Sequence, residues 1–161
     1  MRYSQRPFPA YRFIPGQSPH PRRDALGHSY SQPEPTCRNV PAERWFESED
    51  YLFAVDLYNH GYWWESHEVL EALWHAAGHA TPEGEFYRAL IQFDAACLKR
   101  AVGKNAPAQR LLQRGLERLS KFPRQYMGVN VTAFSEAARI SFSESNGPPA
   151  EIRLAWPTPT K

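Results

Sequence analysis

Proline sets the strongest limit on what this chain can fold into, because its ring blocks the interiors of helices and central strands. The 161 residues include 15 Pro, which is about twice the usual share, and twelve of them lie before residue 42 or after residue 147. Long regular elements are therefore expected only in the middle of the chain. We divide the sequence into a Pro-rich arm (1–43), a helical domain (44–142) and a Pro-rich C-terminal tail (143–161).

Apolar residues in the middle of the chain recur at three- and four-residue intervals, the spacing of one face of an α-helix. Ser48, Thr81, Asn105 and Asn130 are good N-cap residues in front of such patterns. The expected helices cover residues 48–59, 62–77, 82–102, 106–121 and 131–142. No segment alternates with the period of two that is typical of strands. These features predict an all-α fold, a compact antiparallel bundle of about four to five helices.

The arm has too many prolines for a long helix, yet it contains several large apolar side chains. These are Phe8, Tyr11, Phe13, Ile14 and Tyr30. Burial of such side chains stabilises a fold, so we expect the arm to wrap around the helical body and dock on it. A disordered tail is the alternative interpretation.

Several classes of protein do not fit the composition. The chain has no run of 18 apolar residues and no apolar segment behind its first residues, so neither a membrane span nor a signal peptide is expected. Cys37 and Cys97 are too few for a disulfide framework or a zinc finger, and the apolar neighbours of Cys97 indicate a small core residue. A cytoplasmic protein is the simplest expectation.

Charge is segregated along the chain, although the formal net charge is only +2. Counting Lys, Arg, Asp and Glu, residues 1–44 carry +4, residues 45–94 carry −9 and residues 95–161 carry +7. Pairing between the acidic centre and its basic flanks is the simpler interpretation. A basic surface for nucleic acid is the weaker hypothesis, in which Arg110, Arg114 and Arg118 on one helical stripe contact phosphates.

The segment from His60 to His79 is the richest in aromatic and titratable side chains, with three Trp, four His and three Glu. Helical spacing places Trp64, His67, Glu71 and Trp74 on one face, with Glu68 and His75 beside them. A His and a Glu one turn apart can ligate one metal ion. They can also exchange a hydrogen bond that fixes the tautomer of the imidazole.

Known metal motifs match this segment only in part. His67-Glu68-x-x-Glu71 resembles the zinc-binding pattern H-E-x-x-H, but Glu replaces the second His. The Glu-x-x-His motif of di-iron bundles is absent. A buried hydrogen-bond network between helices fits equally well. Ser66 is a poor nucleophile for His67, because adjacent residues on a helix point apart.

The arm supplies further candidate ligands, namely His20, Asp24 and His28. If the arm packs over the second helix, these residues could meet His67 and Glu71 in a mixed nitrogen and oxygen site suited to zinc, manganese or iron. The alternative is a polar loop with exposed histidines.

Two polar residues, Gln92 and Asp94, interrupt the apolar pattern of the third expected helix. We expect Asp94 at a solvent-facing edge. The alternative is a partly buried carboxylate paired with Arg22 or Arg88.

The segment Leu57–Trp74, which reads LYNHGYWWESHEVLEALW, resembles the signature of domain-of-unknown-function family 309. Residues 88–92 and the leucines between 111 and 119 extend this resemblance over about residues 48–130. The resemblance implies a small all-helical protein and no established activity. The family pattern more often has Gln-Gly where this chain has Arg88-Ala89. The positions that match, taken as candidate ligand-binding residues, are Glu65, His67, Glu68, Glu71, Trp74 and Gln92.

Two classes of function follow from these observations. The first is a metal- or small-ligand-binding protein with a His/Glu site on the second helix, a divalent metal being one candidate cofactor. In its hydrolase version the metal lowers the pKa of a bound water and Glu68 is the general base. The second is a non-enzymatic interaction or homo-oligomerisation module, in which the His/Glu network is structural.

Overall fold

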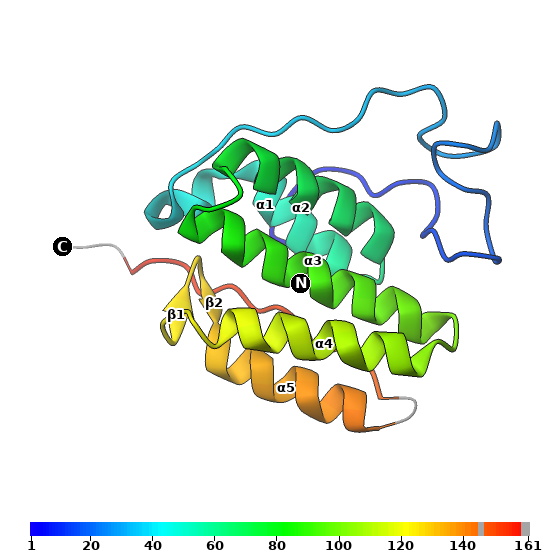
Figure 1. The fold of residues 1–161 in the computed structure, drawn as a ribbon. Helices are drawn as coiled ribbons and strands as arrows, with labels where there is room; N and C mark the ends of the chain where they lie inside the picture. Colours follow the sequence, from blue (N-terminus) through cyan, green and yellow to red (C-terminus); the bar gives the residue numbers. More distant parts are fainter. Residues whose placement is uncertain (145–146, 159–161) are drawn as a thin grey trace.

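The computed structural model describes residues 1–144 and 147–158, and helices dominate it (Figure 1). The predicted all-α class and the five predicted helices are confirmed, with boundaries that differ by one or two residues. The elements in chain order are η1, a 3₁₀ helix (Ala42–Glu47), α1 (Glu49–Asn59), α2 (Trp63–Ala77), α3 (Pro82–Ala101), α4 (Asn105–Leu119), β1 (Gln125–Tyr126), β2 (Val129–Asn130) and α5 (Val131–Ser143).

Side-chain caps explain where three of these helices begin. The hydroxyl of Ser48 accepts a hydrogen bond from the backbone N–H of residue 51 at 3.2 Å, and that of Thr81 accepts from residue 84 at 3.0 Å. The Asn130 amide oxygen does the same for residue 133 at 3.0 Å. Each bond satisfies a backbone donor that the first turn of a helix leaves free. The expected cap at Asn105 is wrong, because Asn105 is already helical and Lys104 precedes it without a side-chain cap.

The connections between successive helices lie at alternating ends of the molecule, which gives the predicted antiparallel bundle (Figure 1). The main packed pairs are α1 with α2, α2 with α3, and α3 with α4. In α1, all eight residues from Tyr51 to Tyr58 are buried. A helix that is buried on every side belongs to the interior of a fold, so α1 is the centre around which other segments gather.

Close approach between α3 and α4 depends on a missing side chain. A Cβ atom built on Gly115 of α4 would lie 2.8 Å from the ring of Phe93 on α3. Phe93 is fully buried and its ring also packs edge-on against Phe134 of α5, with the centroids 5.0 Å apart. Gly115 therefore lets one aromatic ring fill the space among three helices.

A short hairpin, β1–β2, joins α4 to α5, with Gln125 opposite Asn130. Its turn has positive φ at Met127 and Gly128, and the indole of Trp45 lies where a Cβ of Gly128 would be. The Tyr51 hydroxyl donates to the Met127 carbonyl at 3.0 Å. Two-residue strands are too short to produce an alternating sequence pattern, so the hairpin was not predicted.

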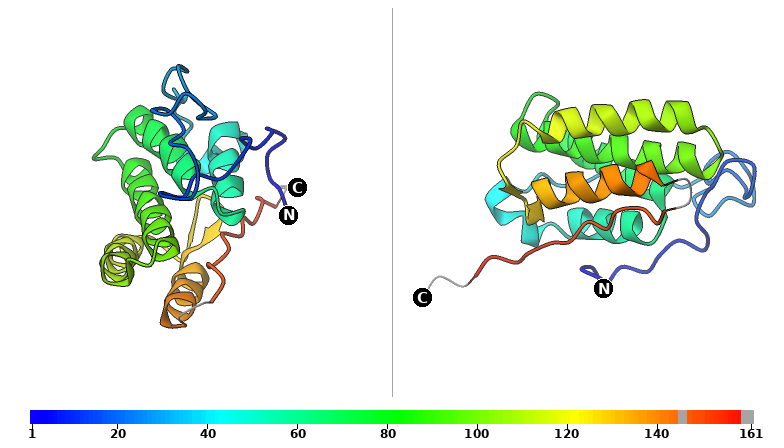
Figure 2. Two further views of the ribbon diagram at one scale, coloured as in Figure 1. Left: turned by 90° about the vertical axis from the view of Figure 1, so that its right-hand side faces the viewer. Right: turned by 90° about the horizontal axis from the view of Figure 1, so that it is seen from below.

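Segments near both ends of the chain contact α1, and Figure 2 shows them running beside it. The buried carboxylate of Asp56 accepts hydrogen bonds from the backbone N–H groups of Tyr3 and Ser4, each at 2.8 Å. The side chain of Asn59 pairs with the backbone N–H and C=O of Ile152, also at 2.8 Å. The arm is thus fixed at its start by a buried charge and is not restrained by apolar contacts alone.

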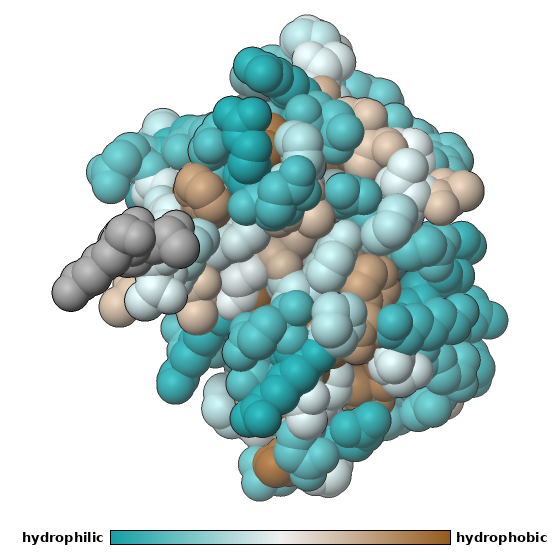
Figure 3. Space-filling model, turned by 90° about the vertical axis from the view of Figure 1, so that its left-hand side faces the viewer, coloured by the Kyte–Doolittle hydropathy of each residue, from teal (hydrophilic) through white to brown (hydrophobic). Residues whose placement is uncertain are grey.

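The face that carries η1 and the hairpin is mostly hydrophilic, with scattered apolar spots (Figure 3). In the part of the chain that the structure describes, no helix is long and apolar enough to cross a membrane. Cys97 is buried in the core, as expected, and Cys37 is half-buried. Arg118 forms an ion pair with Glu85 of α3, so one member of the arginine stripe has an internal partner.

Candidate functional site

The buried face of α2 differs from the one that the sequence indicated. Its members are Glu65, Ser66, Val69, Leu70 and Leu73. His67 and Glu71 lie outside this face, with side chains that are 36% and 43% exposed and 4.0 Å apart. The buried His67–Glu71 network is therefore wrong. Partial burial lowers the pKa of His67, although the carboxylates of Glu71 and Glu68 oppose this shift.

Asp94 lies in the core and not at the expected solvent-facing edge. It is fully buried, and one of its oxygens is 2.9 Å from the hydroxyl of Ser66 on α2. Neither Arg22 nor Arg88 is its partner. Burial raises the pKa of Asp94 well above its usual range.

The arm docks on the first two turns of α2 through Glu65. This carboxylate is nine-tenths buried, and its Oε1 accepts from the backbone N–H of Phe13 at 2.9 Å. Nε2 of His28 lies 2.8 Å from the same oxygen. The other oxygen, Oε2, is buried without a hydrogen-bond partner among the described residues. Glu65 thus fixes two points of the arm and still has an unused acceptor.

Glu68, one turn further along α2, holds a third point of the arm. Its carboxylate accepts from Nε of Arg22 at 2.8 Å, and both side chains are about one-fifth exposed. Between these polar contacts, the indole of Trp64 meets the rings of Phe13 and His20 edge-on, at centroid distances of 5.7 and 5.6 Å. The family signature on α2 is therefore the surface that receives the arm.

A cleft of about 240 Å³ remains between the arm and the helices α1 and α2, and we call it the arm–helix cleft. Its apolar lining comes mainly from Phe53, Leu57, Trp64 and Val69 together with three prolines of the arm. Its polar lining consists of Arg6, Arg22, His28, Ser29, Gln32, Glu65 and Glu68. An apolar pocket with a few convergent polar groups is the usual form of a small-molecule site.

The predicted composite metal site does not assemble. His28 does reach α2, but it contacts Glu65 and not His67 or Glu71. Nδ1 of His20 accepts from the backbone N–H groups of residues 22 and 23, and Asp24 accepts from the N–H of residue 26. Among the residues described, no three His, Cys, Asp or Glu side chains gather in a way that could hold a metal ion.

The remaining two candidate residues lie away from this cleft. Trp74, near the end of α2, stacks on the ring of His79 with centroids 4.0 Å apart, and the Arg88 guanidinium lies 5.6 Å from its centre. The side-chain oxygen of Gln92 on α3 is buried without a partner among the described residues. Neither residue lines the arm–helix cleft.

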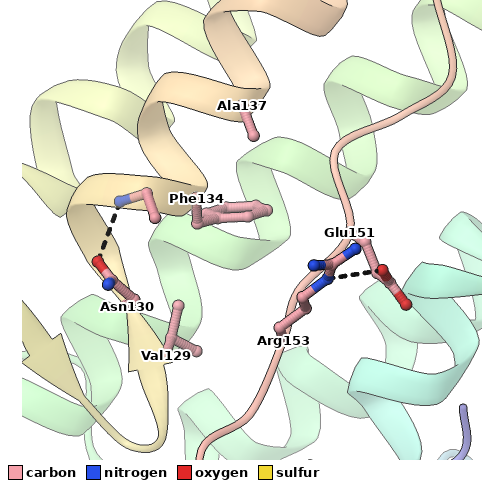
Figure 4. A pocket seen from close by; sticks show the side chains of 7 residues that line it. Val129, Asn130, Phe134, Ala137, Glu151 and Arg153 are labelled. Atoms are coloured by element: carbon pink, nitrogen blue, oxygen red, sulfur yellow. Dashed lines mark hydrogen bonds and ion pairs between the residues drawn. The ribbon is translucent and has the colours of Figure 1, made fainter.

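A second groove, of about 310 Å³, lies between α5 and the C-terminal segment (Figure 4). Its lining is Val129, Asn130, Ala133, Phe134, Ala137, Glu151 and Arg153. The polar groups here have local partners, because Asn130 caps α5 and Arg153 pairs with Glu151 at 3.0 Å (Figure 4). The groove is larger than the arm–helix cleft, but it brings together no set of reactive groups.

Fold and site together define a helical-bundle protein whose N-terminal arm closes a cleft of mixed polar and apolar lining against its second helix. Residues 51–111 match the family described as a domain of unknown function (DUF309), and this part of the chain is a DUF309 domain. The resemblance seen in the sequence over about residues 48–130 is thereby confirmed for residues 51–111. A search among curated proteins found no match to the chain.

The matched region begins in α1 and ends in α4, so it contains Glu65 and Glu68 but not the arm. The cleft is therefore built from two sources, the family domain and a segment outside the match. Arg22, His28 and Ser29 come from the latter. His28 was a candidate because of its residue type, whereas no pattern in a Pro-rich segment pointed to Ser29 or to the Arg22–Glu68 pair.

Proposed function

We propose that the protein binds a small organic molecule in the arm–helix cleft. The observation that carries this proposal is the unused Oε2 of Glu65, a buried acceptor on a residue that lines the cleft. A buried polar atom without a partner costs about 1–3 kcal/mol, and native proteins rarely tolerate this without a compensating role. A ligand hydroxyl or N–H group that reaches this oxygen would remove the cost.

The lining of the cleft limits the chemistry of the ligand. A volume of about 240 Å³ lies below the usual range for drug-sized ligands, so the ligand is small. Phe53, Trp64 and Val69 favour an apolar portion. Arg22 already pairs with Glu68, and Arg6 with Asp50 at 2.6 Å, so the charges are largely balanced. A neutral molecule with one polar end fits these features best.

Nuclear magnetic resonance tests this proposal with a panel of small alcohols, amines and esters. We expect some members to shift the indole N–H signal of Trp64, identified from Trp64→Phe, and the amide signals of His28 and Ser29. Gln32→Trp places a large ring at the exposed rim of the cleft and should weaken binding at least tenfold. Gln113→Trp, on the exposed face of α4, is the matched control. The proposal fails if no compound moves these signals, or if both variants bind equally.

Metal binding has weaker support from the geometry than the binding of an organic ligand. His67 and Glu71 are one turn apart, but only these two of the five candidate ligands face each other. Elemental analysis of the purified protein beside His67→Ala tests the metal-dependent version. A stoichiometric metal that disappears in the variant would favour it over the organic ligand.

As the alternative to ligand binding, we propose homo-oligomerisation through the Trp-rich helix α2. Trp63 and Trp74 are partly buried and pack against the core, so they offer only part of their surface to a second molecule. Light scattering at high protein concentration tests the idea, and a monomer would argue against it. Nucleic-acid binding, the weakest hypothesis, predicts a steep loss of affinity with added salt.

A further inference from the structure

We infer that Ser29, His28 and Glu65 form a hydrogen-bonded relay that makes Ser29 a nucleophile toward small carboxylic esters in the arm–helix cleft. This inference rests on the proposed binding function, since the ester would be the ligand. It adds a reaction and a substrate class to the site. The sequence had indicated no nucleophile, and the only Ser–His pair considered there was Ser66–His67.

The three side chains are connected at hydrogen-bond distance. The hydroxyl oxygen of Ser29 lies 2.8 Å from Nδ1 of His28, and Nε2 of His28 lies 2.8 Å from Oε1 of Glu65. All three residues line the same cleft. A nucleophile next to a base that a third group orients is the general signature of an activated hydroxyl.

Glu65 determines which nitrogen of His28 acts as the base. A carboxylate can only accept hydrogen bonds, so Nε2 carries the proton that it donates to Glu65. The lone pair is then on Nδ1, which faces the hydroxyl of Ser29. In the well-known serine triads the two nitrogens have the opposite roles, but the chemistry requires only that one nitrogen accept the proton while the other is held.

The local backbone explains why adjacent residues can form this pair. Adjacent side chains on a helix point apart, but residues 20–32 form consecutive turns, with Ser29 N–H donating to the Pro21 carbonyl at 3.0 Å. A Cβ on Gly27 would lie 2.2 Å from the same carbonyl oxygen, so only glycine allows this turn. The backbone N–H of His28 donates to the Tyr11 hydroxyl at 3.2 Å, and the Tyr11 ring packs against the imidazole with the centroids 4.7 Å apart.

The surroundings suit a transient positive charge on the imidazole. The side chains of His28 and Glu65 are only 6% and 4% exposed, so the carboxylate acts on the imidazolium with little screening by water. Arg6 and Arg22 line the same cleft and supply its positive charges for a developing oxyanion. Ser29 itself is partly exposed and therefore accessible to a substrate.

The proposed reaction needs no further reagent than water. The Ser29 oxygen bonds to the ester carbonyl carbon while its proton moves to Nδ1 of His28. The bond to the alkoxide leaving group then breaks, and the leaving group takes this proton and departs as an alcohol. Water attacks the acyl-serine in the same way, giving its proton to Nδ1. That proton returns to the Ser29 oxygen as the acid departs.

A fluorophosphonate reagent and mass spectrometry of the full chain test this inference. We expect one covalent adduct, mapped to Ser29, in the wild type and in the neighbouring control Ser31→Ala. The adduct should be absent in Ser29→Ala. The labelling rate should fall at least about 100-fold in His28→Asn, because general-base assistance contributes about 10²–10⁴.

Two further measurements keep the inference separate from effects on folding and binding. Circular dichroism checks that the variants keep their helices, and the shift of the Trp64 signal checks that Ser29→Ala still binds esters. Ester binding without any adduct on wild-type Ser29 would overturn the relay and leave the binding function intact. If the wild type neither binds esters nor forms the adduct, the binding function and the relay are both overturned. An equal labelling rate in His28→Asn would overturn the role of His28.

Discussion

The strongest energetic prediction concerns Asp94, which we expect to be protonated in the folded protein. Its Oδ2 lies 2.9 Å from the Ser66 hydroxyl, and the same hydroxyl lies 3.1 Å from the carbonyl oxygen of Ala54. A serine hydroxyl has a single proton to donate. Both contacts are hydrogen bonds at once only if Asp94 donates to Ser66 and Ser66 donates to Ala54. The raised pKa of this fully buried carboxyl agrees with that arrangement.

This arrangement fixes the sign of a pH effect on stability. In the unfolded chain Asp94 has an ordinary pKa near 3.9, whereas burial raises its pKa in the folded protein. Between the two pKa values the folded state binds the proton and the unfolded state does not. The stabilisation is therefore complete below the unfolded pKa. It is lost by up to about 1.4 kcal/mol per pH unit as the pH rises toward the folded pKa.

The variant Asp94→Asn isolates the contribution that the titration of Asp94 makes to the free energy of unfolding. The amide donates to Ser66 as the protonated acid does and has almost the same shape, but it does not titrate. We expect this variant to be at least as stable as the wild type at neutral pH, and its advantage to increase from pH 5 to pH 8. Asp94→Ala should lose about 2–3 kcal/mol, because it removes the hydrogen bond and leaves a small cavity.

Urea unfolding at several pH values measures these differences. Glu136→Gln on the exposed face of α5 is the control for losing one carboxyl group. Its free energy of unfolding should change with pH as that of the wild type does. Parallel pH profiles for the wild type and Asp94→Asn would refute the reasoning. That result would mean that Asp94 is ionised in the folded protein and that Ser66 donates to it.

Three further predictions concern stability and reactivity. Asp56→Asn should lose about 2–4 kcal/mol of unfolding free energy, since an amide oxygen replaces only one of two charged acceptors. The amide hydrogens of Tyr3 and Ser4 should then exchange faster with solvent, and unchanged exchange would contradict this prediction. Gly115→Ala should lose up to about 2 kcal/mol of unfolding free energy, measured by urea unfolding, because the clash with Phe93 exceeds the gain in helix propensity. A stabilised variant would show that the Phe93 ring can move aside at little cost. Cys37 and Cys97, whose pKa values burial raises to about 12, should react with iodoacetamide at pH 8 only after unfolding; rapid alkylation of the folded protein would contradict this.

The sequence was sufficient for the helices because several independent signals coincided there. Ser48, Thr81 and Asn130 cap helices whose apolar faces also have the right period, and Gly61 and Gly103 follow the ends of the first two of these helices. The helix after Asn105 was also predicted from its apolar face, and only its cap was wrong, because α4 begins at Asn105 itself. No set of agreeing sequence signals marks the hairpin or η1. Both depend on contacts of Trp45 with Tyr51 and Gly128, and Gly128 is distant from Trp45 in the sequence.

The candidate site shows where residue types alone mislead. Hydrophobic scales favour Trp64 and Trp74 as the core face of α2, but the structure buries Glu65 and Ser66 instead. The arm partners Oε1 of Glu65, and α1 and α3 partner the Ser66 hydroxyl. Partners in other parts of the chain cannot be read from a local pattern. The composite site required the arm to pack over α2, and His28 does lie there. It contacts Glu65 and not His67 or Glu71, which are two and six residues further along α2, because Glu65 is the carboxylate that faces inward.

The enclosure of α1 by both chain ends has a consequence for synthesis on the ribosome. The N-terminal contacts with Asp56 can form early, but Ile152 follows Asn59 by 93 residues. At about 5–20 residues per second, this interval lasts roughly 5–20 s. During that time one flank of the central helix has no native neighbour from the nascent chain. We therefore expect chains released before residue 152 to need chaperone protection, and chains released after it to complete folding at once.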